Sequence, residues 1–320
     1  MTINYTEVGN GITAIDTLYV RPNMDASHLI ISEGEAAYVD TGTSHSVTSL
    51  LQTLHDKKLA PDSVRYIFLT HIHLDHAGGA GVLSQSLPNA KVVVHPRGAP
   101  HMIDPGRLIA GSKAVYGDEL YRQLYGEIMP VDQEKIQLAE DGDVFPLGDR
   151  AFTTIHTPGH ALHHYCLVDE SSRIVFSGDT FGISYREFDT DNGAFIFPTT
   201  TPVHFDPLQL QNSIDRIMSY RPEVIYLTHY SRVSDTLGWL AADLHRAIDA
   251  FVAIAERWEH MSDRSARIRN DMFDWLSHKL DEHGYTGSAA ERHRLLDPDI
   301  DLNTQGLEVW MQRRKNMAAG

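Results

Sequence analysis

The sequence has only one cysteine, no long apolar run and no secretory signal, and each of these absences argues against a class of protein. Its 320 residues hold one cysteine, Cys166, so no disulfide can form within the chain. No run of about 18 apolar residues is free of polar ones, which argues against a membrane-spanning helix. The opening "MTINYTEVGNGITAIDTLYV" has neither a basic start nor an unbroken apolar stretch, so no secretory signal is expected. These shortages predict a cytoplasmic protein with no membrane partner.

Positive charge is scarce as well. The chain has 27 Lys and Arg against 43 Asp and Glu, which gives a formal net charge of −16. Binding to a phosphate backbone normally needs a basic surface. The composition therefore predicts a small-molecule substrate and no nucleic-acid partner. It leaves a homodimer open as the oligomeric state.

The first part of the chain has the pattern of an α/β protein. "HLIISEGEAAYVDTG" predicts two strands around the turn Glu33-Gly34, and "SVRYIFLT" and "KVVVHP" predict buried strands. "SVTSLLQTLHDKKL" has helical spacing between the first two of these segments. A polar and helical stretch from about Arg97 to Gln133 is expected to be an insertion beside the core.

The pattern becomes helical from about Asp235. Apolar residues recur every three or four positions, at Leu240, Leu244, Ile248, Phe251, Ile254 and Trp258, and again at Ile268, Met272, Trp275 and Leu276. This spacing is typical of amphipathic helices. We predict a catalytic domain over residues 1–234 and a C-terminal helical extension over residues 235–320, packed on the core.

The segment "THIHLDHAGG", residues 70–79, concentrates four groups that can bind a metal. Side chains alternate along an extended chain, so His71 and His73 should point the same way. Asp75 and His76 follow where two glycines mark a tight turn, and they can face a second point. Buried together without a cation, these groups would be costly polar groups in need of partners. The segment therefore predicts binding of two metal ions.

Three later segments end an apolar run at a potential ligand. His160 follows "TPG", Asp179 follows "VFSG" and His229 follows "YLT". Open α/β sheets gather their sites at the carboxyl ends of strands. We therefore expect these three residues at the same edge as the 70–79 segment.

The ordered set "HIHLDH", "TPGH", "SGD" and "LTH" closely resembles the metallo-β-lactamase superfamily over roughly residues 10–232. The resemblance implies an αβ/βα sandwich with a binuclear site at its rim. One metal ion would then be held by the imidazoles of His71, His73 and His160. The other would be held by Asp75, His76 and His229, with Asp179 as the bridge. Asp40, in "YVDTG", matches the family's buried acidic residue near the site, where we expect it to support a ligand.

The expected chemistry is hydrolysis by a metal-bridging hydroxide. Two metal ions about 3.5–4 Å apart can hold a bridging water and lower its pKa toward roughly 7. Asp75 or Asp179 would relay the proton to the leaving group. Tyr185, six residues after Asp179, is a candidate for stabilising the oxyanion. Imidazole and carboxylate ligands do not choose the metal, so zinc is the first expectation and iron or manganese the alternatives.

Two neighbours of His160 have other expected roles. His164 follows it by four residues, as in the "GHxxxH" pattern common in these hydrolases, and is expected beside the ligands or in the pocket wall. Cys166 lies within a predicted strand, where a small buried hydrophobe is the expected identity.

The branch of the family sets the predicted reaction. Two-metal β-lactamases lack the aspartate bridge, which argues against antibiotic hydrolysis, whereas the glyoxalase II and lactonase branches keep it. The glyoxalase II signature after that aspartate does not match "GDTFGISYREFDTDNGAFIFPTTTPVHFDP". We predict cleavage of a small carboxylic ester, lactone or thioester, in a pocket walled by aromatic residues of 98–130 and 181–205. The alternatives are an iron-dependent oxidoreductase, either a dioxygenase or an oxygen-binding di-iron protein, and a signalling or binding member of the same fold.

Overall fold

The computed structural model describes residues 4–319, which divide into two compact units. Unit 1 runs to His156 and adds His163–Gly178 and Tyr220–Asp235. Unit 2 comprises Thr157–Leu162, Asp179–Ser219 and the residues from Thr236 on. Both β-sheets lie in unit 1, whereas unit 2 is mainly helical.

The first sheet of unit 1 has the strand order β1-β2-β3-β4-β5-β6-β7. Its strands are β1 (Tyr5–Gly9), β2 (Ile12–Asp16), β3 (Ala26–Ser32), β4 (Glu35–Val39), β5 (Val64–Leu69), β6 (Lys91–Val94) and β7 (Ile136–Leu138). The turn predicted at Glu33 and Gly34 joins β3 to β4, and both residues have positive φ angles, 47° and 83°. From β4 to β7 the strands are parallel. The carboxyl ends of β4 and β5 therefore meet at one edge.

The second sheet has the order β13-β12-β11-β10-β9-β8. Its strands are β8 (Val144–Leu147), β9 (Arg150–His156), β10 (Tyr165–Asp169), β11 (Ile174–Gly178), β12 (Val224–Leu227) and β13 (Ser231–Ser234). Only the pair β11–β12 is parallel among these described strands. Thr228 and His229 follow the carboxyl end of β12 directly.

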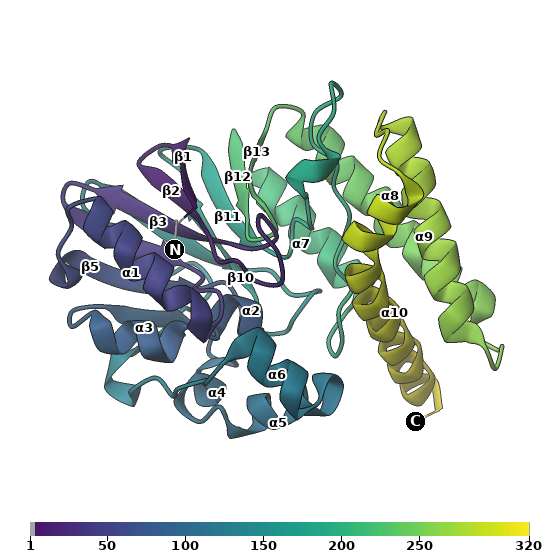
Figure 1. Cartoon of the computed structure of the whole chain (residues 1–320), viewed down its shortest axis with the longest axis horizontal. Helices are drawn as coiled ribbons and strands as arrows, with labels where there is room; N and C mark the ends of the chain where they lie inside the picture. The colour runs from purple at the N-terminus through teal and green to yellow at the C-terminus, as the bar shows by residue number, and fades with distance from the viewer. Residues whose placement is uncertain (1–3, 320) are drawn as a thin grey trace. The chain divides into compact units, whose positions relative to one another are not determined.

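The two sheets pack face to face through a shared aromatic core. Phe68 from the first sheet meets Phe145 at a ring distance of 5.5 Å, and Phe152 and Phe176 continue the same buried cluster. The other face of the first sheet is covered by α1 (Val47–Asp56) and α3 (Ala80–Ser86), as Figure 1 shows. Complete burial of one such side chain contributes about 1.5–3 kcal/mol. Unit 1 is thus a helix–sheet–sheet sandwich.

The stretch expected as an insertion is helical. It holds α4 (Ala99–Ile103), α5 (Gly106–Tyr116) and α6 (Asp118–Tyr125). Tyr121 and Tyr125 pack on Leu74 of α2 (Leu74–Ala77) in a small separate cluster. Because Leu74 is next to Asp75 in the chain, the insertion lies beside the predicted ligands.

Unit 2 is built around four helices. They are α7 (Pro207–Ser219), α8 (Leu237–Trp258), α9 (Arg264–Glu282) and α10 (Ala289–Ala319). The last three run side by side in Figure 1 and bury the apolar stripes expected from the sequence, including Leu244 and Phe251 of α8 and Met272 of α9. Unit 2 also takes in Asp179–Ser219, from before the predicted boundary at residue 235. Among the described helices, none is both long and apolar enough to cross a bilayer.

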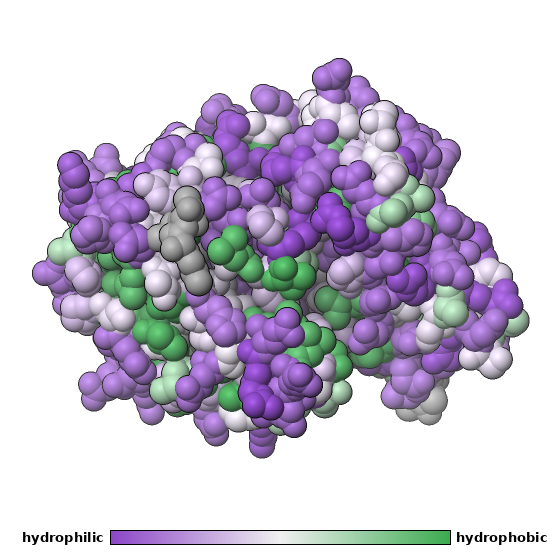
Figure 2. Space-filling view, in the orientation of Figure 1, coloured by the Kyte–Doolittle hydropathy of each residue, from purple (hydrophilic) through white to green (hydrophobic). Residues whose placement is uncertain are grey.

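The surface is mainly hydrophilic on the face drawn in Figure 2, where apolar residues form small groups. The exposed large apolar side chains include Leu18 and Val20 in one loop of unit 1, and Trp239 on α8. Scattered exposed apolar residues are normal in globular proteins. The structure confirms the predicted α/β class, with a helical insertion and C-terminal helices.

Candidate metal centre

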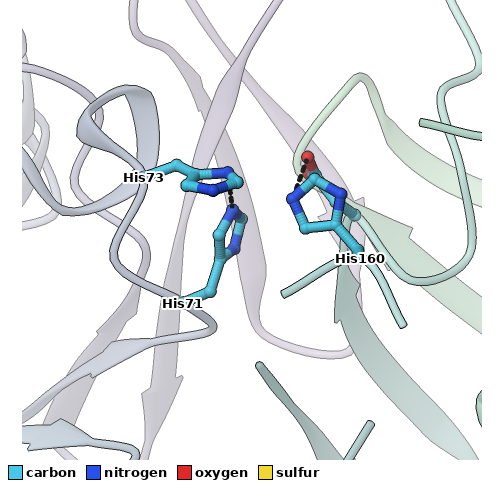
Figure 3. Close-up of side chains that lie close together, drawn as sticks. His71, His73 and His160 are labelled. Atoms are coloured by element: carbon cyan, nitrogen blue, oxygen red, sulfur yellow. Dashed lines mark hydrogen bonds and ion pairs between the residues drawn. The ribbon is translucent and has the colours of Figure 1, made fainter. Parts of the chain in front are cut away.

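Two ligand candidates lie on the segment that leaves β5. His71 is buried and His73 half-buried, and α2 begins directly after them. His71 Nε2 and His73 Nδ1 lie 2.9 Å apart, with the two rings turned toward each other in Figure 3. Either nitrogen can be the donor of this contact, depending on the tautomer, and both are atoms with which a histidine binds a metal ion.

A second group of ligand candidates gathers within unit 1. Asp75, His76 and His229 each offer one ligand atom, and these atoms lie within 4.8 Å of one another. Asp75 Oδ2 is 3.7 Å from His229 Nε2 and 3.9 Å from His76 Nε2. Two imidazoles and a carboxylate form a donor set that suits zinc, iron or manganese. The fold thus brings the end of β12 to α2, far apart in the chain.

Asp40 connects the ends of three strands beside this group. It follows β4 with a φ of 57°, and its carboxylate accepts hydrogen bonds from the backbone N–H and the hydroxyl of Thr70, at 2.9 and 3.0 Å. It also accepts from Thr228 Oγ1 and His76 Nδ1, both at 2.8 Å. The bond from Nδ1–H sets the tautomer of His76 and leaves Nε2 for a metal. This geometry agrees with the supporting role that the sequence suggests.

His229 is oriented by the start of β3. Its Nδ1 donates to the backbone oxygen of Met24 at 2.9 Å, and the N–H of Ala26 donates to the oxygen of Thr228 at 2.8 Å. A ring nitrogen that donates to a carbonyl leaves the other nitrogen as the metal ligand. His229 Nε2 is the atom that faces Asp75.

Asp25 is a buried carboxyl group that the sequence patterns did not single out. Thr17 Oγ1 donates to its Oδ2 at 3.0 Å, whereas Oδ1 has no hydrogen-bond partner among the described residues. Burial raises the pKa of Asp25 to about 7, and the neighbouring His229 and His76 counteract part of this rise. No local motif marks the residue, because its burial comes from β3 reaching the end of β12.

The other two predicted ligands lie together in unit 2. His160 Nε2 is 3.5 Å from Asp179 Oδ2, the contact drawn at His160 in Figure 3. Both side chains are buried. His160 follows Gly159, whose φ of 131° and tight fit against Leu210 exclude any side chain there. The sequence "TPGH" thus bends the chain so that His160 faces Asp179.

Three tyrosines form a group near Asp75. The hydroxyls of Tyr19 and Tyr125 lie 3.0 Å apart, and the rings of Tyr116 and Tyr125 meet at 5.8 Å. Burial raises the pKa of all three, and the charge of Asp75 raises each further. They therefore remain protonated and can donate hydrogen bonds. Tyr116 and Tyr125 belong to the predicted pocket wall, whereas Tyr19 had no sequence signal.

His163 and His164 lie next to the pair formed by His71 and His73. The ring of His164 is stacked on His71 at 5.0 Å, and that of His163 lies 5.8 Å from His73. His164 is buried, in keeping with the supporting position expected for it. Cys166 is buried on β10, where its thiol donates to the backbone oxygen of Ser177, which confirms the expectation of a buried small residue.

Tyr185 lies in a buried part of unit 2. Its hydroxyl donates to Asp299 Oδ2 at 3.0 Å, and its ring packs near Phe188 and Phe197. This contact ties the loop after Asp179 to α10. The expected part of Tyr185 in stabilising an oxyanion stays a prediction.

The comparisons with known proteins agree on one family. A family model for the metallo-beta-lactamase superfamily matches residues 20–229. The metallo-beta-lactamase fold-containing protein ST1585 of Sulfurisphaera tokodaii is 31% identical over 218 residues, which cover 67% of this chain and 75% of that protein. The crystal structure of ST1585 from Sulfolobus tokodaii superimposes with a TM-score of 0.64 at 24% identity, over 93% of this chain and 98% of that one.

Two relatives are named as enzymes. The human acyl-coenzyme A thioesterase MBLAC2 is 29% identical over 185 residues, 55% of this chain and 65% of that protein. The hydroxyacylglutathione hydrolase of Maricaulis maris is 33% identical over 147 residues, 46% of this chain and 43% of that protein. Both alignments cover less than two thirds of the relative, so the likeness is to a part of each enzyme.

Proposed function

Because the chain belongs to the metallo-beta-lactamase superfamily, we propose that it is a metal-dependent hydrolase of a small carboxylic ester, lactone or thioester. The observation that carries this proposal is the group Asp75, His76 and His229, whose ligand atoms lie within 4.8 Å of one another. Asp40 and Met24 orient its two imidazoles so that their Nε2 atoms face Asp75. Such support from outside the ligand set is usual for metal sites.

The proposed ligand set is the one that the family pattern implies. His71, His73 and His160 would hold one metal ion, and Asp75, His76 and His229 the other, with Asp179 shared by both. The donor chemistry supports it, since imidazole and carboxylate are the groups that bind zinc, iron and manganese. Zinc is our first choice for both positions.

The division of labour follows from these positions. The chemistry that two divalent ions would supply here, when bound, is activation of a water and polarisation of the scissile carbonyl. Asp75, which is partly exposed, can take the proton released and return it to the leaving group. Asp40 stays outside the reaction and keeps His76 in one tautomer. The hydroxyls of Tyr19 and Tyr125 share one hydrogen bond, so the one that accepts it can donate its own hydrogen to a polar group of the substrate near Asp75.

The substrate class rests on three supports. Two relatives are named as hydrolases of thioesters, one of acyl-coenzyme A and one of hydroxyacylglutathione. The tyrosines beside Asp75 suit a small acyl group with a few polar anchors. The net charge of −16 disfavours polyanions, so we propose no nucleic-acid partner. We propose a homodimer as the oligomeric state.

The proposal is tested with full-length protein that has been loaded with zinc and analysed for metal content. Short-chain esters, lactones and thioesters are compared with a phosphodiester at matched concentration. We expect the carbon esters, lactones or thioesters to be cleaved and the phosphodiester to be left intact. Preferential phosphodiester cleavage would contradict the substrate class. Iron bound after purification without added metal, together with no hydrolysis, would favour the oxidoreductase alternative instead.

A further inference from the structure

Helix α10 is attached to the loop 198–205 by a buried side chain. Asn303, which is 1% exposed, accepts a hydrogen bond from the N–H of Thr200 at 2.6 Å and donates to the oxygen of Pro198 at 3.2 Å. The hydroxyl of Thr200 donates to the backbone oxygen of Asn303 at 3.0 Å. These three bonds fix the backbone of the loop at Thr200.

The attachment continues along the helix. At Gly306 a Cβ atom would overlap the carbonyl oxygen of Thr200, so α10 and the loop touch backbone to backbone. Arg313 donates to the oxygens of Val203 and Phe205 at 2.9 and 3.3 Å. Helix α10 thus holds the loop from Thr200 to Phe205.

The residue after Thr200 reaches a predicted metal ligand. Thr201 Oγ1 lies 3.3 Å from His160 Nδ1, and His160 Nε2 faces Asp179. When Nε2 binds a metal, Nδ1 carries the hydrogen and donates it to the Thr201 hydroxyl. Such a bond holds the ring of a metal-binding histidine and raises its basicity.

The backbone around His160 is held separately. The N–H of Asp206 donates to the oxygen of Gly159 at 2.8 Å, and Ser213 Oγ donates to the oxygen of Pro158 at 2.6 Å. Loss of the Thr201 hydroxyl therefore leaves the chain path in place. It releases only the rotation of the imidazole ring.

We propose that Asn303 and Thr201 are positioning residues that link the C-terminal helix α10 to the metal ligand His160. The helical extension is then a working part of the metal centre, because Asn303 fixes Thr200 and so places Thr201 against the ring. This inference rests on the proposed function only in that His160 is taken as a metal ligand. It does not depend on the substrate.

The test measures Zn²⁺ affinity of the full-length metal-free protein by competition with a chromophoric chelator. Thr201→Val removes the hydroxyl at nearly constant shape, whereas Thr201→Ser keeps it. We expect Thr201→Val to weaken one of the two Zn²⁺ sites by about 10–100-fold and to leave the other unchanged. Thr201→Ser should bind as the parent does. Thermal unfolding of the metal-free proteins checks that each variant folds.

A second pair of variants tests the helix. Asn303→Ala should weaken the same Zn²⁺ site as Thr201→Val. The matched control is Asp301→Asn on the same helix, which removes an exposed ion pair with Arg269 and touches no loop bond. Equal losses in Asn303→Ala and Asp301→Asn would overturn the link, since they would show a general effect of helix stability. If the Asn303→Ala variant does not fold, the Thr201→Val and Thr201→Ser variants alone test the inference.

The outcomes separate this inference from the proposed function. Parent-like zinc binding by Thr201→Val overturns the inference even if esters are hydrolysed. A selective loss of one site, in a protein that hydrolyses no compound of the panel, supports the inference and contradicts the proposed function. A parent that binds no zinc, iron or manganese contradicts both.

Discussion

At the scale of single residues, one buried carboxylate beside the proposed centre accepts hydrogen bonds from several parts of the chain. The carboxylate of Asp40 accepts hydrogen bonds from Thr70, Thr228 and His76, which come from three different elements. Its positive φ is a conformation that aspartate adopts at a modest cost. Such a residue stabilises the strand ends and the tautomer of one ligand at the same time.

Asp179 gives a prediction at this scale. Its carboxylate is buried, lies beside His160 and is the proposed bridge. We expect Asp179→Ala to lose at least one metal ion per chain and most hydrolytic activity, because a bridge contributes to both ions. Metal analysis after gel filtration, with Asp191→Ala in an exposed turn as control, measures the loss. Two metal ions per chain and normal turnover in Asp179→Ala would rule out the bridging role.

His28 gives a prediction about pH. It is buried between Phe176 and Tyr226, and burial lowers its pKa to about 4, below the ordinary 6.5. The native state keeps it neutral, whereas the unfolded chain takes up a proton below about pH 6.5. The free energy of unfolding therefore falls as the pH drops from about 6.5 to about 4, by up to about 3 kcal/mol, and the fall stops below about 4.

Urea unfolding of the metal-free protein across this pH range measures the effect. His28→Phe should remove this part of the pH dependence, and His55→Gln, at an exposed position, should keep it. Identical slopes for the parent and His28→Phe would assign the acid sensitivity to other groups.

At the scale of elements, strand ends and helix contacts supply the site. In unit 1, β4, β5 and β12 end directly before Asp40, Thr70 and Thr228, and the first ligand candidates after β5 and β12, His71 and His229, come two residues after the strand ends. In unit 2, α7 holds the backbone before His160 and α10 holds the loop that carries Thr201. The ligand candidates His76, His229 and His160 are therefore held by residues from parts of the chain that contribute no ligand candidate.

Two glycine substitutions test how closely the elements approach. Gly306→Ala in α10 places a methyl group on the backbone of Thr200, and we expect it to lower the free energy of unfolding by about 2–3 kcal/mol. Gly111→Ala in α5 meets nothing within 4 Å, and should raise stability by about 0.5–1 kcal/mol. Chemical unfolding measures both. A neutral effect at Gly306 would mean that α10 does not contact the loop as closely as described.

At the scale of the whole molecule, charge is the dominant property. The net charge of −16 goes with the hydrophilic surface seen in Figure 2. A molecule with a net negative charge repels anionic substrates over roughly a Debye length, which is about 30 Å at 0.01 M salt and about 8 Å at 0.15 M. Salt should therefore affect anionic substrates in particular.

The measurable consequence is that the salt dependence of kcat/KM should differ between an anionic and a neutral substrate. For an anionic thioester, kcat/KM should rise as salt is increased from about 0.01 M to about 0.15 M. For a neutral lactone or ester it should stay constant over the same range. A fall for the anionic thioester would show that local positive groups, and not the net charge, control its approach.

The sequence by itself determined the parts of the protein that depend on neighbours in the chain. His71, His73, Asp75 and His76 are recognisable because they share one short segment after a buried strand. Alternation along its extended part predicts the common direction of His71 and His73, whereas Asp75 and His76 lie in α2. His160, Asp179 and His229 could be anticipated because each ends an apolar run abruptly. The strands β3 to β6 and the amphipathic stripes of α8 and α9 follow from periodicity in the same way.

The tertiary structure alone decided which distant residues support these ligand candidates. Asp25 and Met24 meet His229 only because β3 starts beside the end of β12. Tyr19 joins Tyr125 only because the insertion packs on the loop after β2. Asn303 reaches Thr200 because α10 packs on a loop that precedes it by about a hundred residues. Hydrogen bonds of this kind depend on the packing of whole elements, and no local pattern of residue types encodes that packing.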